Sequence, residues 1–389
     1  MTSGARWMGV GRSAGADSRA AAALAARSAI VGPDAKLLLV FAAITHDLAA
    51  VQEGIAEVAG GVPVIGCTTH GEIAPGGPSD GSVTVAAIGG PGFSIGTAVA
   101  EHVAGRQREA GAEVTVRAAE GVEGPYQVLL LLTDGLIRDQ EAILRGCYSV
   151  LGASVPLFGG AAGDGWRMTG TYLMADGKVH TDAVAAAMIA SEAPLAVSVR
   201  HGWRPVGEAM LVTSGANGRV HTLNDRPAMD VYLDRLGAPP EAYADPAAFV
   251  DFALSRPLGV QRRSGVRAHN LSTEVDVEGR SIGGGSAIDQ GNLTWILEGD
   301  RDSILGAVDH ACADARAALG GAAPIGMLTF SCAATRAVIG DDGIRYEAAR
   351  LERVADGTPF AGFYTYGEIA RVGGIDGFHN QTLVVLAFA

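Results

Sequence analysis

Apolar and polar positions along the chain change period in the same order three times. An apolar run is followed by apolar residues at helical spacing, then by a short apolar run, a glycine-containing turn and a further apolar run. In the first copy the apolar run Leu37 to Ala43 precedes helical spacing at Leu48, Val51, Ile55 and Val58. We therefore predict three copies of one unit, built as strand, helix, strand, turn and strand.

The turns of the three copies share a motif. The segments are VPVIGCTTHGEI (Val62 to Ile73), VPLFGGAAGDG (Val155 to Gly165) and TPFAGFYTYGEI (Thr358 to Ile369), and each has a glycine three residues after a proline. The first and third copies agree most closely, and Asp80-Gly81 returns as Asp376-Gly377. This agreement indicates an internal duplication.

A constant offset between the first and third copies gives a specific expectation. Gly66 should superpose on Gly362, and Glu72 on Glu368. The sheets should be mixed, because a crossover helix joins one pair of strands and a tight turn joins the next. Two more tight turns, Ala175-Asp176-Gly177 and Asn217-Gly218, are typical of hairpins.

The fold class that these patterns predict is α+β, with repeated strand-helix-strand-strand units in mixed β-sheets flanked by helices and two pseudo-related domains. Residues 1–32 are interpreted as a lead-in with one Ala-rich helix, in which GVGRSAG (Gly9 to Gly15) is a flexible loop. Residues 33–236 form the first domain and residues 237–389 the second, with Pro239-Pro240 as the linker signal.

The composition argues against nucleic-acid-binding and membrane-spanning proteins. The chain has 389 residues, of which 48% are apolar and 18% charged, and its net charge is −13. No Lys/Arg stripe is present, which argues against a nucleic-acid partner. No apolar stretch approaches the roughly 20 residues of a membrane span, and no secretory signal precedes the first unit. We expect a cytoplasmic protein without a membrane partner.

Catalytic signatures do not occur in a usable context. There is no G-x-S-x-G elbow, no HExxH and no P-loop. The four cysteines are widely spaced, and none forms a zinc pattern. We therefore expect a binding protein with no catalytic residue, no metal and no cofactor.

Polar residues at the ends of buried strands, beside glycines that let a ligand approach the backbone, are typical of a small-molecule pocket. The candidate ligand-binding residues are His70, Gly71, Glu72, Asp164, Tyr366, Gly367, Glu368, His379 and Asn380. An alternative stays open for the two glutamates, which would satisfy backbone donors in a tight turn. For His379 and Asn380 the alternative is a satisfied pair at a strand end.

Three further residues carry alternatives. Cys332 ends a buried strand with Arg336 near, and these two residues are candidates for a reactive or pocket-lining pair. An inert buried thiol outside any disulfide is the other reading of Cys332. His201 opens HGWRP, and a histidine there could ligate haem iron or lie at a surface strand end.

The chain resembles the FIST family, whose paired FIST N and FIST C domains form an intracellular sensory module. The resemblance covers nearly the whole chain and is carried by GCTTHGEI, VPLFGGAAGDG, HGWRP with VTSGANGRVHTLNDRPAMDVY, FSCAATRAVIG, and GFYTYGEIARVG with FHNQTLVVLAF. The family commonly has two adjacent basic residues where this chain has Thr335-Arg336, so only Arg336 is carried over.

The resemblance implies a bacterial signal-transduction protein that senses a small ligand, with an amino acid or a related metabolite as the ligand class. The signal would pass to a separate protein such as a histidine kinase or a cyclic-dinucleotide enzyme. Two alternatives remain: a haem-binding nitric-oxide sensor of the same family, and an uncharacterised enzyme that uses Cys332 or a His/Glu pair.

Overall fold

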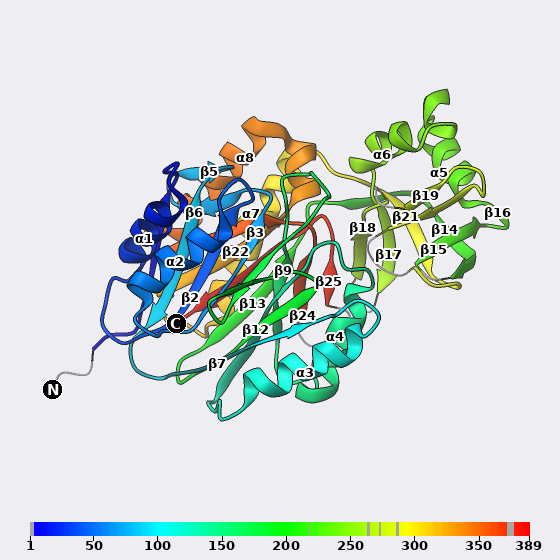
Figure 1. Cartoon of the computed structure of the whole chain (residues 1–389). Helices are drawn as coiled ribbons and strands as arrows, with labels where there is room; N and C mark the ends of the chain where they lie inside the picture. Colours follow the sequence, from blue (N-terminus) through cyan, green and yellow to red (C-terminus); the bar gives the residue numbers. More distant parts are fainter. Residues whose placement is uncertain (1–3, 217, 263–264, 272–273, 285–287, 372–376) are drawn as a thin grey trace.

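One succession of elements, built as strand, helix, strand, helix and four strands, is used three times along the chain. The computed structural model describes residues 4–216, 218–262, 265–271, 274–284, 288–371 and 377–389. Figure 1 shows the three units gathered into one body, with a smaller module to one side. That module interrupts the third unit between its first strand and its first helix.

The elements have the following bounds. The first unit contains β1 (Trp7–Ser13), α1 (Ser18–Ala29), β2 (Ala35–Ala43), α2 (Leu48–Ala59), β3 (Val64–Thr69), β4 (Glu72–Ala74), β5 (Gly77–Ser79) and β6 (Val83–Gly89). The second contains β7 (Phe93–Glu101), α3 (Gln107–Ala119), β8 (Tyr126–Thr133), α4 (Gln140–Leu151), β9 (Leu157–Ala161), β10 (Leu173–Ala175), β11 (Lys178–His180) and β12 (Ala183–Ser191). The third contains β13 (Leu195–Arg200), α7 (Arg301–Ala318), β22 (Gly326–Cys332), α8 (Ala333–Ala355), β23 (Phe360–Thr365), β24 (Glu368–Arg371), β25 (Phe378–His379) and β26 (Leu383–Phe388).

The inserted module is a largely antiparallel sheet with short helices. Its elements are β14 (Arg204–Ala216), β15 (Arg219–Leu223), β16 (Arg226–Pro227), α5 (Ala228–Leu236), the 3-10 helix η1 (Pro240–Tyr243), α6 (Pro246–Leu254), β17 (Leu258–Arg262), β18 (Gly265–His269), β19 (Glu274–Asp276), β20 (Ser281–Gly283) and β21 (Leu293–Glu298). A separate buried cluster, which includes Tyr232 and Phe249, forms its core.

Each unit gives a hairpin to the sheet of another unit. The hairpin β10–β11 of the second unit extends the first sheet through β3, and β24–β25 of the third unit extends the second sheet through β9. The hairpin β4–β5 of the first unit closes the cycle by pairing with β23 of the third. The three sheets are therefore interdependent, and each mixes one parallel pair with antiparallel pairs.

The repeated glycine of the turn motif has the same steric cause in every unit. It lies in the parallel strand pair, directly opposite a residue of the preceding strand. A Cβ atom at Gly66, Gly159 or Gly362 would lie 2.3, 1.9 or 1.6 Å from that residue's carbonyl oxygen. The predicted match of Gly66 to Gly362 is confirmed by this shared register, and only glycine fits there.

A single apolar core lies between the three sheets of the repeat. Four phenylalanines from all three units meet in it, at ring-centroid distances from 4.6 to 5.5 Å: Phe41, Phe158, Phe330 and Phe363. All four side chains are fully buried. Paired helices cover the outer faces, since α1 contacts α2, α3 contacts α4 and α7 contacts α8.

The predicted α+β class, the mixed sheets and the common strand order of the first and third copies are confirmed. The hairpin at Asp176-Gly177 is confirmed as β10–β11, with both residues at positive φ. The hairpin at Asn217-Gly218 joins β14 and β15, although Asn217 itself lies outside the described residues. The Ala-rich helix of the lead-in is α1.

Two expectations were wrong. The segment Gly9 to Gly15 is not a flexible loop, because most of it belongs to β1, which pairs with β6 along its length. Glycine at position 9 is needed for close packing, since a Cβ atom there would lie 2.1 Å from the Ala29 carbonyl oxygen. The match of Asp80 to Asp376 also fails, because Glu72 pairs with Ser79, seven residues on, whereas Glu368 pairs with His379, eleven residues on.

The longer third hairpin makes Asn380 the structural counterpart of Asp80. Asp376 itself lies outside the described residues.

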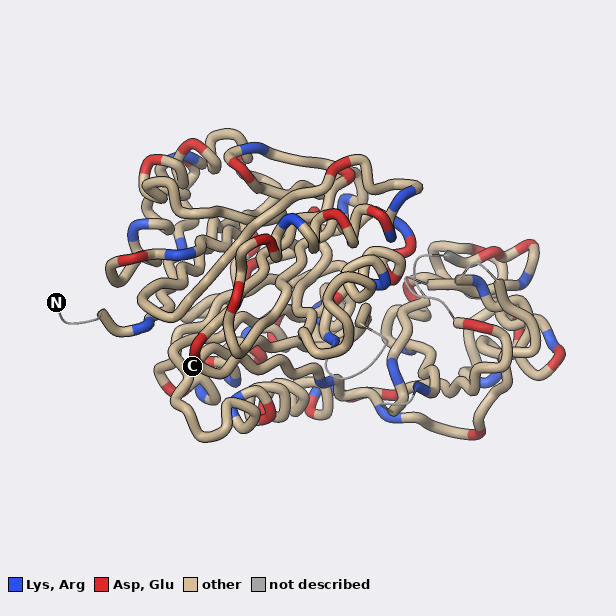
Figure 2. The backbone as a smooth tube through the Cα atoms, turned by 90° about the horizontal axis from the view of Figure 1, so that it is seen from below, with Lys and Arg blue, Asp and Glu red and all other residues tan. Residues whose placement is uncertain are grey.

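Basic and acidic residues are interspersed over both the repeat and the inserted module (Figure 2). Within the described ranges, no helix combines the length and the apolar character needed to cross a membrane.

Candidate functional site

The turn motifs of the three units meet through a cycle of backbone hydrogen bonds. Equivalent N–H groups donate to equivalent carbonyls: His70 N to Tyr364 O at 3.0 Å, Gly163 N to Thr68 O at 3.0 Å, and Tyr366 N to Ala161 O at 3.1 Å. The residues after the three strands therefore lie close together. A Cβ atom at Gly163 would lie 2.7 Å from the His70 nitrogen, so the second copy needs glycine there.

The segment 164–170, which we call the partition loop, is held by the Asp164 carboxylate. This carboxylate accepts N–H groups from Met168, Thr169 and Gly170 at 2.8 to 3.2 Å and the Tyr366 hydroxyl at 2.5 Å. These hydrogen bonds keep the pKa of Asp164 below its ordinary value although burial alone would raise it. Asp164 therefore fixes the shape of the loop.

The partition loop separates two cavities. Gly165 and Arg167 face one of them, whereas Trp166 and Met168 face the other. Trp166 and Met168 both have positive φ, a strained conformation for residues with a side chain, and both side chains are exposed. The indole of Trp166 stacks on Tyr366 at 5.3 Å and meets the His70 ring edge-on at 4.8 Å.

Cavity 1, of about 270 Å³, lies between the repeat and the inserted module. Its wall comes from the segment that leads into α4 (residues 135–140), the junction of β22 and α8 (residues 332–334) and the partition loop. Tyr366 and Asn380 of the third unit also line it, and Asn270 and Gly284 contribute from the inserted module. An occupant of this cavity would contact both parts of the molecule.

Gln140 places an unpaired hydrogen-bond acceptor in the wall of cavity 1. Its side chain lines the cavity, and only 5% of the residue is exposed. The Nε2 group donates to Asp134 O at 2.8 Å and to Ile137 O at 3.1 Å, which fixes the orientation of the amide. Its Oε1 is buried and has no partner among the described residues. An unpaired buried acceptor favours a ligand that brings an N–H donor.

Cavity 2, also of about 270 Å³, repeats the wall of cavity 1 in the first unit. The positions Ala43, Ile44, Thr45, Thr69, His70 and Asp80 correspond by register to Cys332, Ala333, Ala334, Thr365, Tyr366 and Asn380. Gly71, Gly165, Arg167 and Arg336 complete it. Of the predicted ligand-binding residues, His70 and Gly71 line cavity 2, and Tyr366 and Asn380 line cavity 1. The other five line neither cavity: Glu72, Asp164, Gly367, Glu368 and His379.

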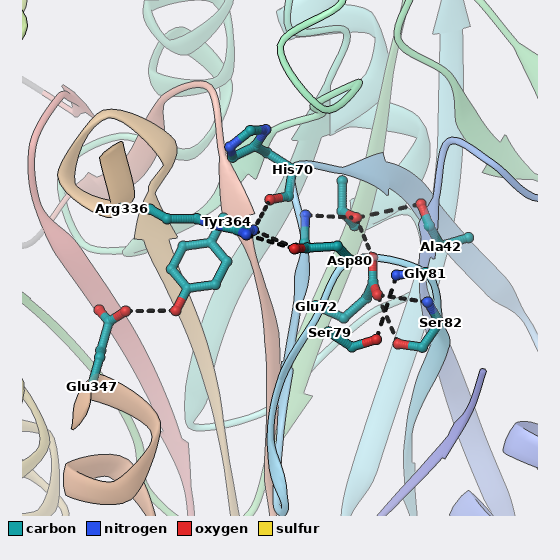
Figure 3. Close-up of polar contacts among 12 residues, drawn as sticks. Ala42, His70, Glu72, Ser79, Asp80, Gly81, Ser82, Arg336, Glu347 and Tyr364 are labelled. Carbon is teal, nitrogen blue, oxygen red and sulfur yellow. Dashed lines mark hydrogen bonds and ion pairs between the residues drawn. The ribbon is translucent and has the colours of Figure 1, made fainter. Parts of the chain in front are cut away.

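Arg336 joins the third unit to the first beside cavity 2. Its guanidinium makes two hydrogen bonds to Asp80, at 2.5 and 2.7 Å, and donates to His70 O at 2.7 Å. Figure 3 shows the guanidinium between Asp80 and the Tyr364 ring, whose hydroxyl donates to the buried Glu347 at 2.7 Å. This ion pair lowers the pKa of Asp80.

The two predicted glutamates line neither cavity and satisfy backbone donors, as one of the two readings of the sequence expects. Glu72 accepts Ser82 N at 3.0 Å, and Glu368 accepts Thr382 N at 3.1 Å. In the second unit Asp134 takes the same part by accepting Asp182 N at 2.9 Å. Burial raises the pKa of Glu72 to about 7 and that of Glu368 to about 8.

The glycines before these glutamates leave space that the protein itself fills. A Cβ atom at Gly367 would lie 2.1 Å from the Phe378 ring. At Gly71 it would lie 2.4 Å from the Arg336 guanidinium and 2.7 Å from the Asp80 carboxylate. Close packing within the protein therefore explains both glycines, rather than ligand access to the backbone.

The remaining candidates are placed as follows. His379 donates from Nε2 to Ala370 O at 2.8 Å, and burial, with the charge of Arg267 second, lowers its pKa to about 3. Cys332 lines cavity 1 and is not in a disulfide. Burial, followed by the charge of Glu368, raises the pKa of the Cys332 thiol far above its ordinary value, so it is protonated at neutral pH.

His201 has both ring nitrogens engaged in neutral-histidine hydrogen bonds. Nε2 donates to Val266 O at 3.0 Å, and Nδ1 accepts Trp203 N at 3.2 Å. No lone pair is left for haem iron, so the arrangement does not fit the haem alternative at this residue. Within the described residues, no group of three or more His, Cys, Asp or Glu side chains is placed to hold a metal ion.

Gln140, Trp166, Arg138 and Asn270 line cavity 1 but were not identified from the sequence. Gln140 follows Asp139, the N-cap of α4, and nothing in its spacing along the sequence indicates an unpaired side-chain oxygen. Trp166 directly follows the glycine turn of the second motif. An aromatic residue at such a loop position indicates a candidate binding residue, and this signal is present in the sequence.

The fold and the two cavities define a three-unit repeat protein with one inserted module. Family comparison agrees over most of the length: residues 36–226 match the FIST N domain and residues 228–371 match the FIST C domain, so the chain belongs to the FIST family. Two uncharacterized proteins of Mycobacterium tuberculosis, from two strains, are each 27% identical over 98% of this chain and 99% of their own length. A crystal structure of cyanuric acid hydrolase from A. caulinodans is similar with a TM-score of 0.38 and 12% identity, over 99% of both chains.

Proposed function

We propose that the protein is a sensor that binds an amino acid or a related amino-bearing metabolite in cavity 1 and passes the signal to a separate output protein. The observation that carries this proposal is the Oε1 atom of Gln140, a buried acceptor without a partner in the wall of the cavity. A ligand ammonium or amine group would supply the missing donor.

The rest of the wall supports the same ligand class. Arg138 lies in the segment that leads into the twelve-residue helix α4, whose N-terminal end favours negative charge. A ligand carboxylate would bind on this side. Trp166 lines the cavity and is exposed, and a ligand side chain would pack against its ring.

Signal output would follow from the position of the cavity. A ligand would contact Tyr366 and Asn380 in the repeat and Asn270 in the inserted module. It would therefore bind best to one arrangement of the two parts and raise the population of that arrangement. A histidine kinase or a cyclic-dinucleotide enzyme is the class of partner that we propose to read this change.

The test is a titration calorimetry series, with a thermal-shift screen of the common amino acids to choose the ligand. The wild-type protein should bind the amino acid about tenfold or more tightly than the same molecule without its amino group, because that analogue leaves the Gln140 oxygen unpaired. In Gln140→Met the two ligands should bind within about twofold of each other.

Trp166→Ala should weaken the amino acid about tenfold, whereas Tyr126→Ala, which removes another exposed aromatic residue at the start of β8, should not. Discrimination between the two ligands that persists in Gln140→Met would contradict the assignment of the amine site.

A further inference from the structure

We propose that cavity 2 is a second ligand site, selective for a small oxyanion such as a phosphate or a carboxylate. It is a separate cavity of about 270 Å³ in the first unit, on the other side of the partition loop from cavity 1. This inference does not depend on the amino-acid proposal, because it uses different residues and a different ligand.

Cavities 1 and 2 occupy equivalent places in two units of the repeat. The repeat places the same backbone positions around both, but the side chains differ in chemistry. His70 stands where cavity 1 has Tyr366, and Asp80 stands where cavity 1 has Asn380. Cavity 2 therefore keeps the backbone positions of a repeated pocket with different side-chain chemistry, as a site for a different ligand would.

The wall of cavity 2 carries an excess of positive charge. Arg336 and Asp80 neutralise each other in a two-point ion pair. Arg167 is exposed at the cavity and has no ion-pair or hydrogen-bond partner for its side chain among the described residues. One guanidinium charge is left over, in a chain whose net charge is −13. Guanidinium groups bind carboxylate and phosphate oxygens in a two-point geometry.

The side chain of His70, which lines cavity 2, has an unsatisfied polar atom. Nδ1 of His70 is buried and has no hydrogen-bond partner among the described residues. Burial, with the charge of Arg336 second, lowers the pKa of His70 to about 4, so the ring is neutral near pH 7. In the tautomer with its proton on Nδ1, this nitrogen donates one hydrogen bond to an oxyanion. Arg167 would supply the charge and His70 a fixed donor.

Hydrogen bonds from the third unit hold the wall of cavity 2 in place at His70. The carbonyl of His70 accepts a hydrogen bond from Arg336, and its N–H donates to Tyr364 O. Gly71 leaves room for the Arg336 and Asp80 pair itself. Figure 3 shows Arg336 at the His70 carbonyl. With the Tyr364 contact, the third unit holds both the carbonyl and the N–H of His70, and a ligand would meet a preformed donor.

The experiment follows the His70 ring by NMR in the full-length protein labelled at histidine, with His70→Ala assigning the signal. Inorganic phosphate and acetate are added separately at constant ionic strength. At least one of them should shift the His70 signal along a saturating curve. Arg167→Gln should weaken that binding about tenfold or more, because a charge-assisted hydrogen bond is lost.

Arg108→Gln is the matched control, since Arg108 is an exposed arginine on α3 and its loss changes the net charge equally. It should leave the dissociation constant within about twofold. Saturation by phosphate alone assigns a phosphate ligand, and saturation by acetate alone assigns a carboxylate. The proposal is overturned if neither anion saturates the signal, or if Arg167→Gln and Arg108→Gln weaken binding equally.

Discussion

Replacing Glu368 by glutamine should reduce the loss of folding stability between pH 5 and pH 8. The side chain is fully buried, and burial raises its pKa from 4.5 to about 8. The folded protein therefore holds this proton more tightly than the unfolded chain does. The stability that results is complete below pH 4.5 and is lost as the pH rises to about 8.

The size of the effect follows from the two pKa values. Each pH unit between them costs about 1.4 kcal/mol of unfolding free energy, and the full interval costs about 5 kcal/mol. A domain has only about 5 to 15 kcal/mol of stability, so the change is large enough to measure. Glutamine keeps an oxygen that can accept the Thr382 N–H and Oγ1–H groups but cannot ionise.

The assay is urea unfolding at pH 5, 6, 7 and 8, with free energies from linear extrapolation. Over this range the unfolding free energy of Glu368→Gln should fall less steeply than that of the wild type, by about 1.4 kcal/mol per pH unit. Glu53→Gln, at a side chain that is 63% exposed, should keep the wild-type slope. Equal slopes for Glu368→Gln and the wild type would refute the raised pKa.

Two further predictions concern the packing of Gly362 and the reactivity of the Cys332 thiol. Gly362→Ala should lower the free energy of unfolding by more than about 3 kcal/mol or prevent folding, because its Cβ atom would lie 1.6 Å from the Thr329 carbonyl oxygen. Gly306→Ala, at an open position in α7, should instead raise stability by up to about 1 kcal/mol. Melting temperatures of the two variants check this prediction, and a stable Gly362→Ala would contradict the strand register. Cys332 should react with iodoacetamide far more slowly than free cysteine at pH 7.5, because its pKa is raised by burial and by Glu368. Mass spectrometry follows the reaction. Rapid labelling of the folded protein would show a reactive thiol and contradict the prediction.

The repeat could be predicted from the sequence because the same steric requirement selects the same residue type in each copy. A glycine three residues after a proline recurs since the opposite strand's carbonyl leaves no room for a Cβ atom. The exchange of hairpins could not be predicted, because local patterning gives strands and turns but not which sheet a strand joins. The first strand was missed because Gly9 and Gly11 lack the apolar side chains by which strands are identified.

The candidate site was predicted in part. Strand-end residues such as His70, Tyr366 and Asn380 do line cavities, since strand ends of the units converge on the cycle of backbone hydrogen bonds. The glutamates were harder to place, because a buried carboxylate that accepts a backbone N–H has the same sequence signature as a ligand contact. Gln140 could not be predicted as a site residue, because the missing hydrogen-bond partner of its Oε1 atom can be identified only in the three-dimensional structure.

Mass spectrometry of the small molecules released from protein purified from its native host would show whether cavity 1 holds an amino-bearing ligand. The wild type and Tyr126→Ala should release the same compound, one that carries an amino group, in stoichiometric amounts, and Trp166→Ala should release much less of it. Release of no compound by the wild type, of a compound without an amino group, or of equal amounts by Trp166→Ala would contradict the account.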